Sequence, residues 1–265
     1  MGVQRARASS CEMTPRHPTA PTRWAARARW PLLAGWLCLS ACRTTPPPPA
    51  PAPPPPPPAP VVVPERIDHY RVDDQASQVL ILVYRDGRMA HLGHNHVLAV
   101  HQLSGEVVVP KDTGDTTFTL EFPVAALSVD EPALRAEQGE DFSAKIDPAS
   151  IDGTRGHMLG EKQLDAAHFP VIRLKSGPLH AAGDRWMTTL YITVRDHLAT
   201  TQVPVALSLT PEELTASGEF DLTHGELGLT PYSIGLGAIR VAETMHVRFR
   251  VRAHHVDDSD AAEHP

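Results

Sequence analysis

The residues with the clearest chemical potential are three closely spaced histidines, His91, His94 and His96, with His101 nearby. In an extended segment, side chains two residues apart point to the same side, so His94 and His96 would share one face. Imidazoles that converge in this way, with a third beside the flexible Gly93, suit Zn²⁺, Cu²⁺ or a haem iron. The spacing therefore supports a metal or haem site at His91, His94 and His96 as one hypothesis.

A second interpretation places His94 and His96 at the rim of a ligand site, where they contact a polar headgroup. Arg155 is a candidate for the same role, because a guanidinium pairs with phosphate through two parallel hydrogen bonds. An anchoring role for Arg155 within the domain is equally compatible with the sequence. With fifteen histidines in the chain, some clustering is also expected by chance.

Enzyme signatures are absent from the sequence. It contains no Gly-x-Ser-x-Gly elbow, no His-Glu-x-x-His, no phosphate-binding glycine loop and no dinucleotide-binding fingerprint. The acidic residues are numerous, but their spacing places no pair across a cleft. We therefore expect a binding protein and no catalytic residues.

The elements that would position these side chains are β-strands. In Thr117–Phe122 and Thr244–Arg252, apolar and polar residues alternate without exception, which indicates strands with one face inward and one in water. Looser alternation predicts further strands at Ile67–Asp73, Gln78–Tyr84, Leu103–Val109, Val171–Ser176, Trp186–Val194, Gln202–Leu209 and Leu214–Leu222. Turn signals such as Asp86-Gly87 and Ser217-Gly218 lie near or within them.

One stretch differs from this pattern. Residues Glu131–Gly139 and Ala149–Asp165 contain helix-compatible segments interrupted by glycines, which predicts a short helical insertion between two groups of strands. An all-β domain with about eight or nine strands forms a sandwich or a closed barrel, and periodicity leaves both open. An eight-stranded barrel is wide enough to hold one slender ligand.

The apolar faces of the predicted strands are the candidates for a ligand tunnel, although each residue is equally compatible with a packed core. These candidates are Phe118, Leu120, Phe122, Leu190, Ile192, Val205, Leu207, Phe220, Met245, Val247 and Phe249.

The first 41 residues have the pattern of a signal peptide. Arg23, Arg27 and Arg29 precede a short apolar run, residues 30–41, which ends in the lipobox Leu39–Cys42. The cysteine of such a motif carries acyl chains, so we expect Cys42 to anchor the protein in a membrane. The other two cysteines, Cys11 and Cys38, would be removed with the leader.

The segment after Cys42 resembles a tether. Residues 42–64 contain thirteen prolines and should adopt polyproline II, a semi-rigid spacer. We expect the folded domain to span residues 65–255 and the polar tail, residues 256–265, to be disordered.

The charge distribution limits the partners of the mature chain. Six of the 24 basic residues and one of the 31 acidic residues precede Cys42, which leaves 18 basic and 30 acidic residues, a formal net charge of −12. A chain this acidic does not bind nucleic acid through bulk charge. Neutral or apolar ligands fit better.

The order of several motifs resembles the YceI-like family of periplasmic lipid- and polyisoprenoid-binding proteins, over about Tyr70 to Val251. The resemblance is carried by Tyr70-Arg-Val-Asp73, His91-Leu-Gly93, Leu103-Ser-Gly-Glu-Val107, Arg155-Gly-His-Met-Leu159, Leu164-Asp165, His168-Phe-Pro170 with the run to Ser176, Leu227-Gly228 and Ile239-Arg-Val-Ala-Glu243. It implies an extended antiparallel eight-stranded barrel of lipocalin-like shape with an apolar tunnel for an isoprenoid chain.

Together these features predict an envelope lipoprotein, anchored on the periplasmic side of the outer membrane, that carries or sequesters an isoprenoid or similar lipid. Burying a five-carbon isoprene unit contributes roughly 3–4 kcal/mol, whereas association costs on the order of 4–15 kcal/mol, so several units must be buried. A metal- or haem-binding module and a ligand-free structural lipoprotein remain the alternatives.

Overall fold

The computed structural model describes residues 67–111 and 113–256. The predicted signal peptide, Cys42, the tether and all but the first residue of the predicted tail lie outside the described residues. Within the described part, no helix is both long and apolar enough to cross a membrane.

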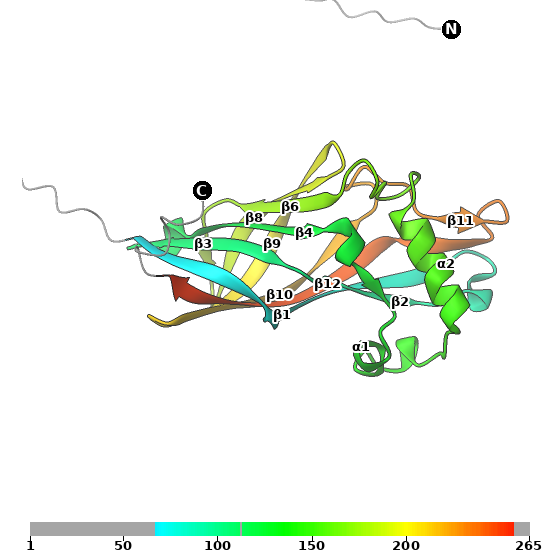
Figure 1. The fold of residues 1–265 in the computed structure, drawn as a ribbon, viewed down its shortest axis with the longest axis horizontal. Helices are drawn as coiled ribbons and strands as arrows, with labels where there is room; N and C mark the ends of the chain where they lie inside the picture. The colour runs from blue at the N-terminus through cyan, green and yellow to red at the C-terminus, as the bar shows by residue number, and fades with distance from the viewer. Residues whose placement is uncertain (1–66, 112, 257–265) are drawn as a thin grey trace, which may run out of the picture. The chain divides into compact units, whose positions relative to one another are not determined.

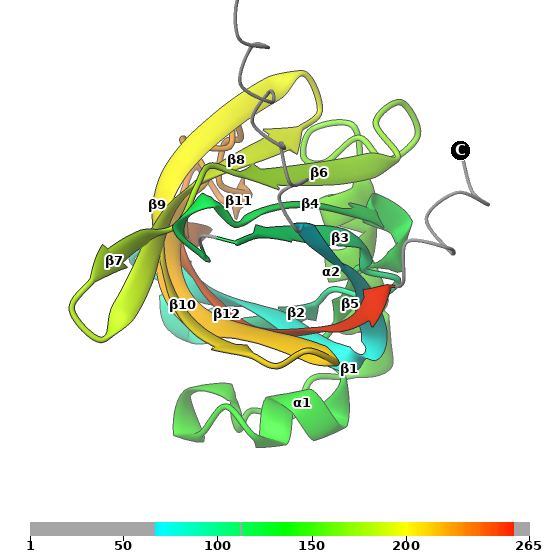
Figure 2. The ribbon, with the colours of Figure 1, turned by 90° about the vertical axis from the view of Figure 1, so that its left-hand side faces the viewer.

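The described residues form a closed antiparallel barrel of eight strands. The strands follow the order β1, β3, β4, β6, β8, β9, β10 and β12, and pairing between β12 and β1 closes the ring (Figure 2). The all-β class, the eight-stranded barrel and the helical insertion predicted from sequence are therefore confirmed, and closure excludes the sandwich.

Eight strands make up the wall: β1 Ile67–Asp86, β3 Ser104–Pro110, β4 Thr117–Pro123, β6 Val171–Ser176, β8 Arg185–Val194, β9 His197–Leu209, β10 Glu213–Thr223 and β12 Ile239–Val256. Four short strands extend it: β2 His96–Ala99, β5 Ser128–Val129, β7 His180–Ala182 and β11 Ser233–Ile234. The helices are α1 Pro132–Ala136 and α2 Pro148–Leu159, and the 3₁₀ turns are η1 Ala90–Leu92, η2 Thr113–Asp115, η3 Val124–Ala126 and η4 Glu140–Phe142.

The first strand is longer than its sequence pattern predicts. The two separate strands expected at Ile67–Asp73 and Gln78–Tyr84 are one strand, β1, whose register against β12 shifts between Asp73 and Gln78. Asp73 Oδ1 accepts hydrogen bonds from the backbone N–H groups of Gln75 and Ala76, at 3.0 and 3.2 Å. This local turn absorbs the extra residues, so β1 continues along the whole barrel.

Two glycine-based expectations are wrong for physical reasons. Gly153 and Gly156 do not interrupt the helix, because Asp147 caps its first turn by accepting from the Ser150 N–H, and α2 runs on to Leu159. Ser217-Gly218 is not a turn but the middle of β10, paired with Arg250 and Phe249 of β12. A Cβ at Gly218 would lie 2.8 Å from Phe249 Cζ, so the missing side chain makes room for that ring.

The helical insertion covers part of the outside of the barrel. Leu80 and Leu82 of β1 point outward and pack with Val97 of β2 and Phe142 of η4, with Leu134 of α1 at the edge. Figure 2 shows α1 outside the ring, next to β1. Because this stretch of β1 is covered on both faces, its residues 79–83 are uniformly apolar and the strict alternation is lost.

The interior is packed at the end where β1 begins. Phe220 and Phe249 meet edge to face there, with ring centroids 6.3 Å apart. Farther toward that end, a cluster of buried side chains completes the packing: Tyr70, Val107, Val109, Leu214 and Ala253. The far end of this half is closed by that buried cluster, whereas Phe220 and Phe249, nearer the middle of the barrel, are half-buried.

Candidate functional site

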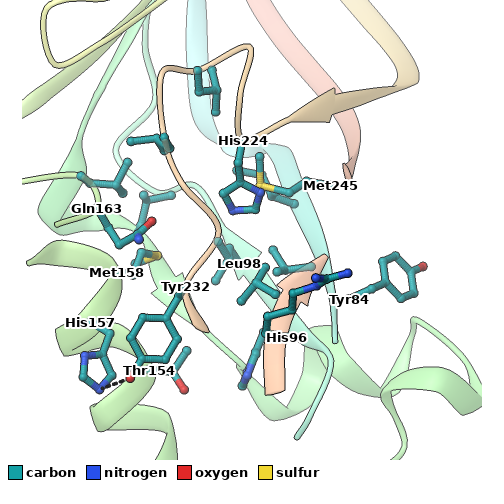
Figure 3. A pocket seen from close by; sticks show the side chains of 18 of the residues that line it. Tyr84, His96, Leu98, Thr154, His157, Met158, Gln163, His224, Tyr232 and Met245 are labelled. Carbon is teal, nitrogen blue, oxygen red and sulfur yellow. Dashed lines mark hydrogen bonds between the residues drawn. The ribbon is translucent and has the colours of Figure 1, made fainter. Parts of the chain in front are cut away.

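The other half of the barrel contains a cavity of about 280 Å³. It lies between the ends of β1, β10 and β12 and is bordered by β2, by α2 and by the chain that joins β10 to β12 (Figure 3). Its inner wall is apolar and includes Val83, Leu98, Phe122, Leu164, Ile172, Val194, Leu222, Leu227, Met245 and Val247. The lining favours a ligand with an apolar body.

The mouth of the cavity is identified by lining residues that are also exposed. These are Arg85, His157, Tyr232, Ile234 and Arg240. Strand pairing places Asp86 of β1 opposite Arg240 of β12 at this end, whereas His69 pairs with Val256 at the other end. In Figure 1, α2, β11 and the turn after β1 gather at the mouth.

The predicted tunnel residues are divided between the two halves. All eleven belong to the inward-facing apolar clusters, as alternation predicts. Three of them, Phe122, Met245 and Val247, line the cavity. The remaining eight lie outside its lining and contribute packing instead: Phe118, Leu120, Leu190, Ile192, Val205, Leu207, Phe220 and Phe249.

His96 lines the cavity and is held by a buried carboxylate. Its Nδ1 donates to Asp130 Oδ2 at 2.6 Å, and Asp130 also accepts from the Val97 N–H at 3.0 Å and from Arg135 Nη1 at 2.5 Å. The Asp130 side chain is fully buried. Because Nδ1 is engaged, Nε2 is the ring nitrogen left for a ligand.

The buried ion pair also fixes the insertion to the barrel. Arg135 of α1 donates to the backbone oxygens of Asn95, Phe142 and Ala144, at 2.7, 2.7 and 3.1 Å. Burial raises the pKa of Asp130, but hydrogen bonds from His96, Val97 and Arg135 outweigh it and hold the pKa below its usual value. The carboxylate is therefore charged at neutral pH.

The histidine cluster does not form the predicted metal centre in the described residues. Among them, no group of three or more His, Cys, Asp or Glu side chains is placed to hold a metal ion. His96 is committed to Asp130, the ring of His94 lies 6.5 Å from that of His96, and His91 is exposed on η1. The ring nitrogens of these three histidines therefore do not converge on one metal or haem iron. His94 and His96 do line the cavity as rim residues.

Arg155 has a different role from the predicted contact with a headgroup. Its guanidinium donates to the backbone oxygens of Ala125 and Leu127, at 2.6 and 3.4 Å, and it does not line the cavity. These bonds fasten α2 to the segment after β4. Arg155 therefore anchors the helix that borders the mouth.

His157, His224 and Tyr232 are among the polar lining residues that were not singled out from the sequence. His157 of α2 stacks on Tyr232 with ring centroids 4.6 Å apart, and the Tyr232 hydroxyl lies 3.2 Å from His157 Nε2 (Figure 3). His224 is only 7% exposed, and its Nδ1 lies 3.0 Å from the Glu243 carbonyl oxygen. No local pattern marks them, because they come from α2 and from the loop after β10.

The polar part of the lining can donate hydrogen bonds or carry positive charge. None of the described residues that line the cavity is Asp or Glu. The lining does include two arginines and several histidines, among them Arg85, His94, His96, His157 and Arg240. Because the Glu243 carbonyl only accepts, His224 Nδ1 carries the hydrogen, and Nε2 of the neutral ring is an acceptor. The site therefore suits an apolar molecule whose polar end, near the mouth, accepts hydrogen bonds and can also donate one.

Comparison with known proteins gives one family match and several similar solved structures. The sequence matches the YceI-like domain over residues 70–253. Burkholderia cenocepacia BcnA has 16% identity and a TM-score of 0.49, covering 68% of this chain and 98% of its own. A Campylobacter jejuni YceI protein has 8% identity and a TM-score of 0.44, covering 60% and 85%. No curated protein matches the sequence.

Proposed function

The chain belongs to the YceI-like family, and from this premise we propose that it is an envelope lipoprotein that binds an isoprenoid or another long apolar lipid. The observation that carries the proposal is the apolar cavity in the open half of the barrel, with hydrogen-bonding side chains gathered near its mouth. A lipid that is nearly insoluble in water needs such an enclosed carrier to leave a membrane.

The lining suggests how the ligand is oriented. A tail packed against Leu98, Met245 and Val247 would place a polar end near His94, His96 and Tyr232. Nε2 of His96, set by the Asp130 bond, is positioned to accept a hydrogen bond from a hydroxyl at that end. This arrangement favours a lipid with a carbonyl, hydroxyl or phosphate head over a plain hydrocarbon.

The cavity also limits how much of the tail is enclosed. Its volume of about 280 Å³ lies near the lower end of typical ligand pockets, roughly 300–1,000 Å³. A long isoprenoid therefore needs more space than the open half provides. We propose that the far end of a long tail either displaces Phe220 and Phe249 or remains at the mouth.

Anchoring is the second part of the proposal. Acylation of Cys42 and the proline-rich tether, residues 42–64, would hold the barrel on the periplasmic side of the outer membrane. Mass spectrometry of the N-terminal peptide from envelope fractions tests it. A diacylated peptide beginning at Cys42 is expected, and an unmodified peptide that retains residues 1–41 would contradict this part.

The ligand proposal is tested by native mass spectrometry and organic extraction of protein purified from a bacterial envelope. We expect an apolar molecule bound in a one-to-one ratio. Leu98→Trp should reduce its occupancy by about ten-fold, because the larger ring fills space that the ligand would use. Leu134→Trp is the matched control, since Leu134 packs outside the barrel.

Each result leads to a different conclusion. Equal occupancy in the wild type and in Leu98→Trp would mean that the molecule binds elsewhere. A protein that is consistently free of ligand, and takes up no added polyprenyl lipid, would leave a structural lipoprotein. Bound metal that is lost in a His94→Ala, His96→Ala double variant would overturn the lipid proposal in favour of the histidines.

A further inference from the structure

The turns that surround the cavity mouth expose large apolar side chains. The connection from β1 to β2 carries Met89 and Leu92, which are 42% and 55% exposed. The turn from β11 to β12 carries Ile234, which is 48% exposed, and Leu236, which is fully exposed. We call these four residues the apolar rim.

The two turns form one surface. The Met89 N–H donates to the Ala238 carbonyl oxygen at 2.8 Å, which joins the two turns directly. Leu236 has a φ of +55° and stands between Gly235 and Gly237, which also have positive φ. This turn presents a leucine at its tip, where a polar residue would be expected in water.

The charge around the rim differs from that of the rest of the chain. Residues 85–96 and 229–242 contain Arg85, Arg88 and Arg240 but a single acid, Asp86, which pairs with Arg240. The chain after Cys42 has 30 acidic and 18 basic residues. An apolar surface with local positive charge is complementary to anionic phospholipid headgroups, whereas the acidic remainder is repelled by them.

We infer that the apolar rim docks on an anionic phospholipid bilayer, with Leu92 and Leu236 entering the boundary between headgroups and acyl chains. The cavity mouth would then open at the membrane surface, and an apolar ligand could pass into the barrel without crossing water. Passage of the ligand rests on the proposed function, but docking does not, so the two can fail separately.

The direction of the strands is compatible with this docking. β1 begins and β12 ends at the packed end of the barrel, where His69 pairs with Val256. The described chain therefore enters and leaves the barrel away from the mouth (Figure 1). A bilayer can approach the rim without meeting either of these connections.

Vesicle flotation tests the inference. The closed barrel and its core are formed within residues 67–256. A chain that begins at Arg43 therefore keeps the folded domain, and it omits both the leader and Cys42. We expect this chain to float with phosphatidylglycerol-containing vesicles, and less with pure phosphatidylcholine. A Leu92→Glu, Leu236→Glu double variant should bind at least about ten-fold more weakly, because burial of two leucines is lost.

The matched control is Leu209→Glu, an exposed leucine at the packed end of the barrel, which should bind vesicles like the wild type. Neither Leu92 nor Leu236 lines the cavity, so uptake of a soluble apolar fluorophore should be unchanged in the double variant. Loss of vesicle binding with normal uptake would support docking. If the wild type itself did not take up the fluorophore, this would instead count against the proposed function.

Two outcomes would overturn the inference. The first is a wild-type chain that does not float with anionic vesicles, or a double variant that floats equally well. The second is self-association of the wild type in sedimentation velocity that the double variant abolishes, without vesicle binding, because the rim would then be an interface between two copies.

Discussion

The same eight strands build both halves of the barrel, yet one half ends in a packed cluster and the other contains the cavity. In the packed half, aromatic rings such as Phe220 and Phe249 meet across the interior. In the hollow half, the wall is mainly aliphatic, and Val83, Val194 and Val247 leave space between them. Both halves have apolar inward faces, so the size of the inward side chains decides where a ligand can enter.

The halves also differ in how the wall is supported. Next to the cavity, His96, Asp130 and Arg135 form a buried polar network that ties β2 to the helical insertion. Side chains that line a cavity have no partner atoms on one side, so this part of the wall has fewer packing contacts. Asp130 and Arg135 lie outside the cavity lining and hold His96 in the wall, so a ligand does not have to displace them.

The largest expected effect comes from truncating side chains in each half. Phe249→Ala should lower the free energy of unfolding by about 4 kcal/mol, because it removes packing in the filled half. Leu98→Ala should cost about 2 kcal/mol, at the low end for a leucine, because Leu98 already borders empty space. Urea denaturation of both variants measures the difference, and equal costs would mean that the two halves are packed alike.

A somewhat smaller effect is expected from breaking the network. Asp130→Asn should lower the free energy of unfolding by about 3 kcal/mol at pH 7, because Arg135 loses its buried partner.

The same variant should alter the response to acid. The pKa of Asp130 is lower in the folded protein, so its contribution is complete above the unfolded-state pKa and is lost as pH falls below about 4. The wild type should therefore lose more stability than Asp130→Asn between pH 5 and pH 3. Parallel pH profiles in urea denaturation would show that Asp130 contributes nothing to this loss.

A smaller effect than that of Asp130→Asn concerns the position that accommodates Phe249. Gly218→Ala should cost about 2 kcal/mol, because the added Cβ would lie 2.3 Å from the Pro204 carbonyl oxygen and 2.8 Å from the Phe249 ring. In a Phe249→Leu background, the part of this cost due to the ring should disappear. A double-mutant cycle in urea gives the coupling, and additive costs would mean that the backbone contact alone is responsible.

The sequence was most informative about local structure. Alternation identified the wall strands and the inward direction of residues such as Phe122 and Met245, because both depend only on neighbours two positions apart. It missed the short strands β2, β5, β7 and β11, which have two to four residues and too few positions to show a period. It also split β1, because the turn at Asp73 interrupts the pattern without ending the pairing.

The candidate site was predicted only in part. The cluster drew attention to His94 and His96, which do line the cavity, but it also suggested a metal centre that the described residues do not form. The competing partner of His96 is Asp130, 34 residues away in the chain. His157 and Tyr232 meet across 75 residues, and no spacing rule connects them.

By itself, the sequence determined an all-β domain whose strands each have an apolar face, since this property belongs to short segments. The tertiary structure alone decided which apolar faces meet ring against ring and which face a cavity. The physical reason is that packing depends on the distance between side chains brought together from distant strands, and closure of β1 on β12 sets that distance.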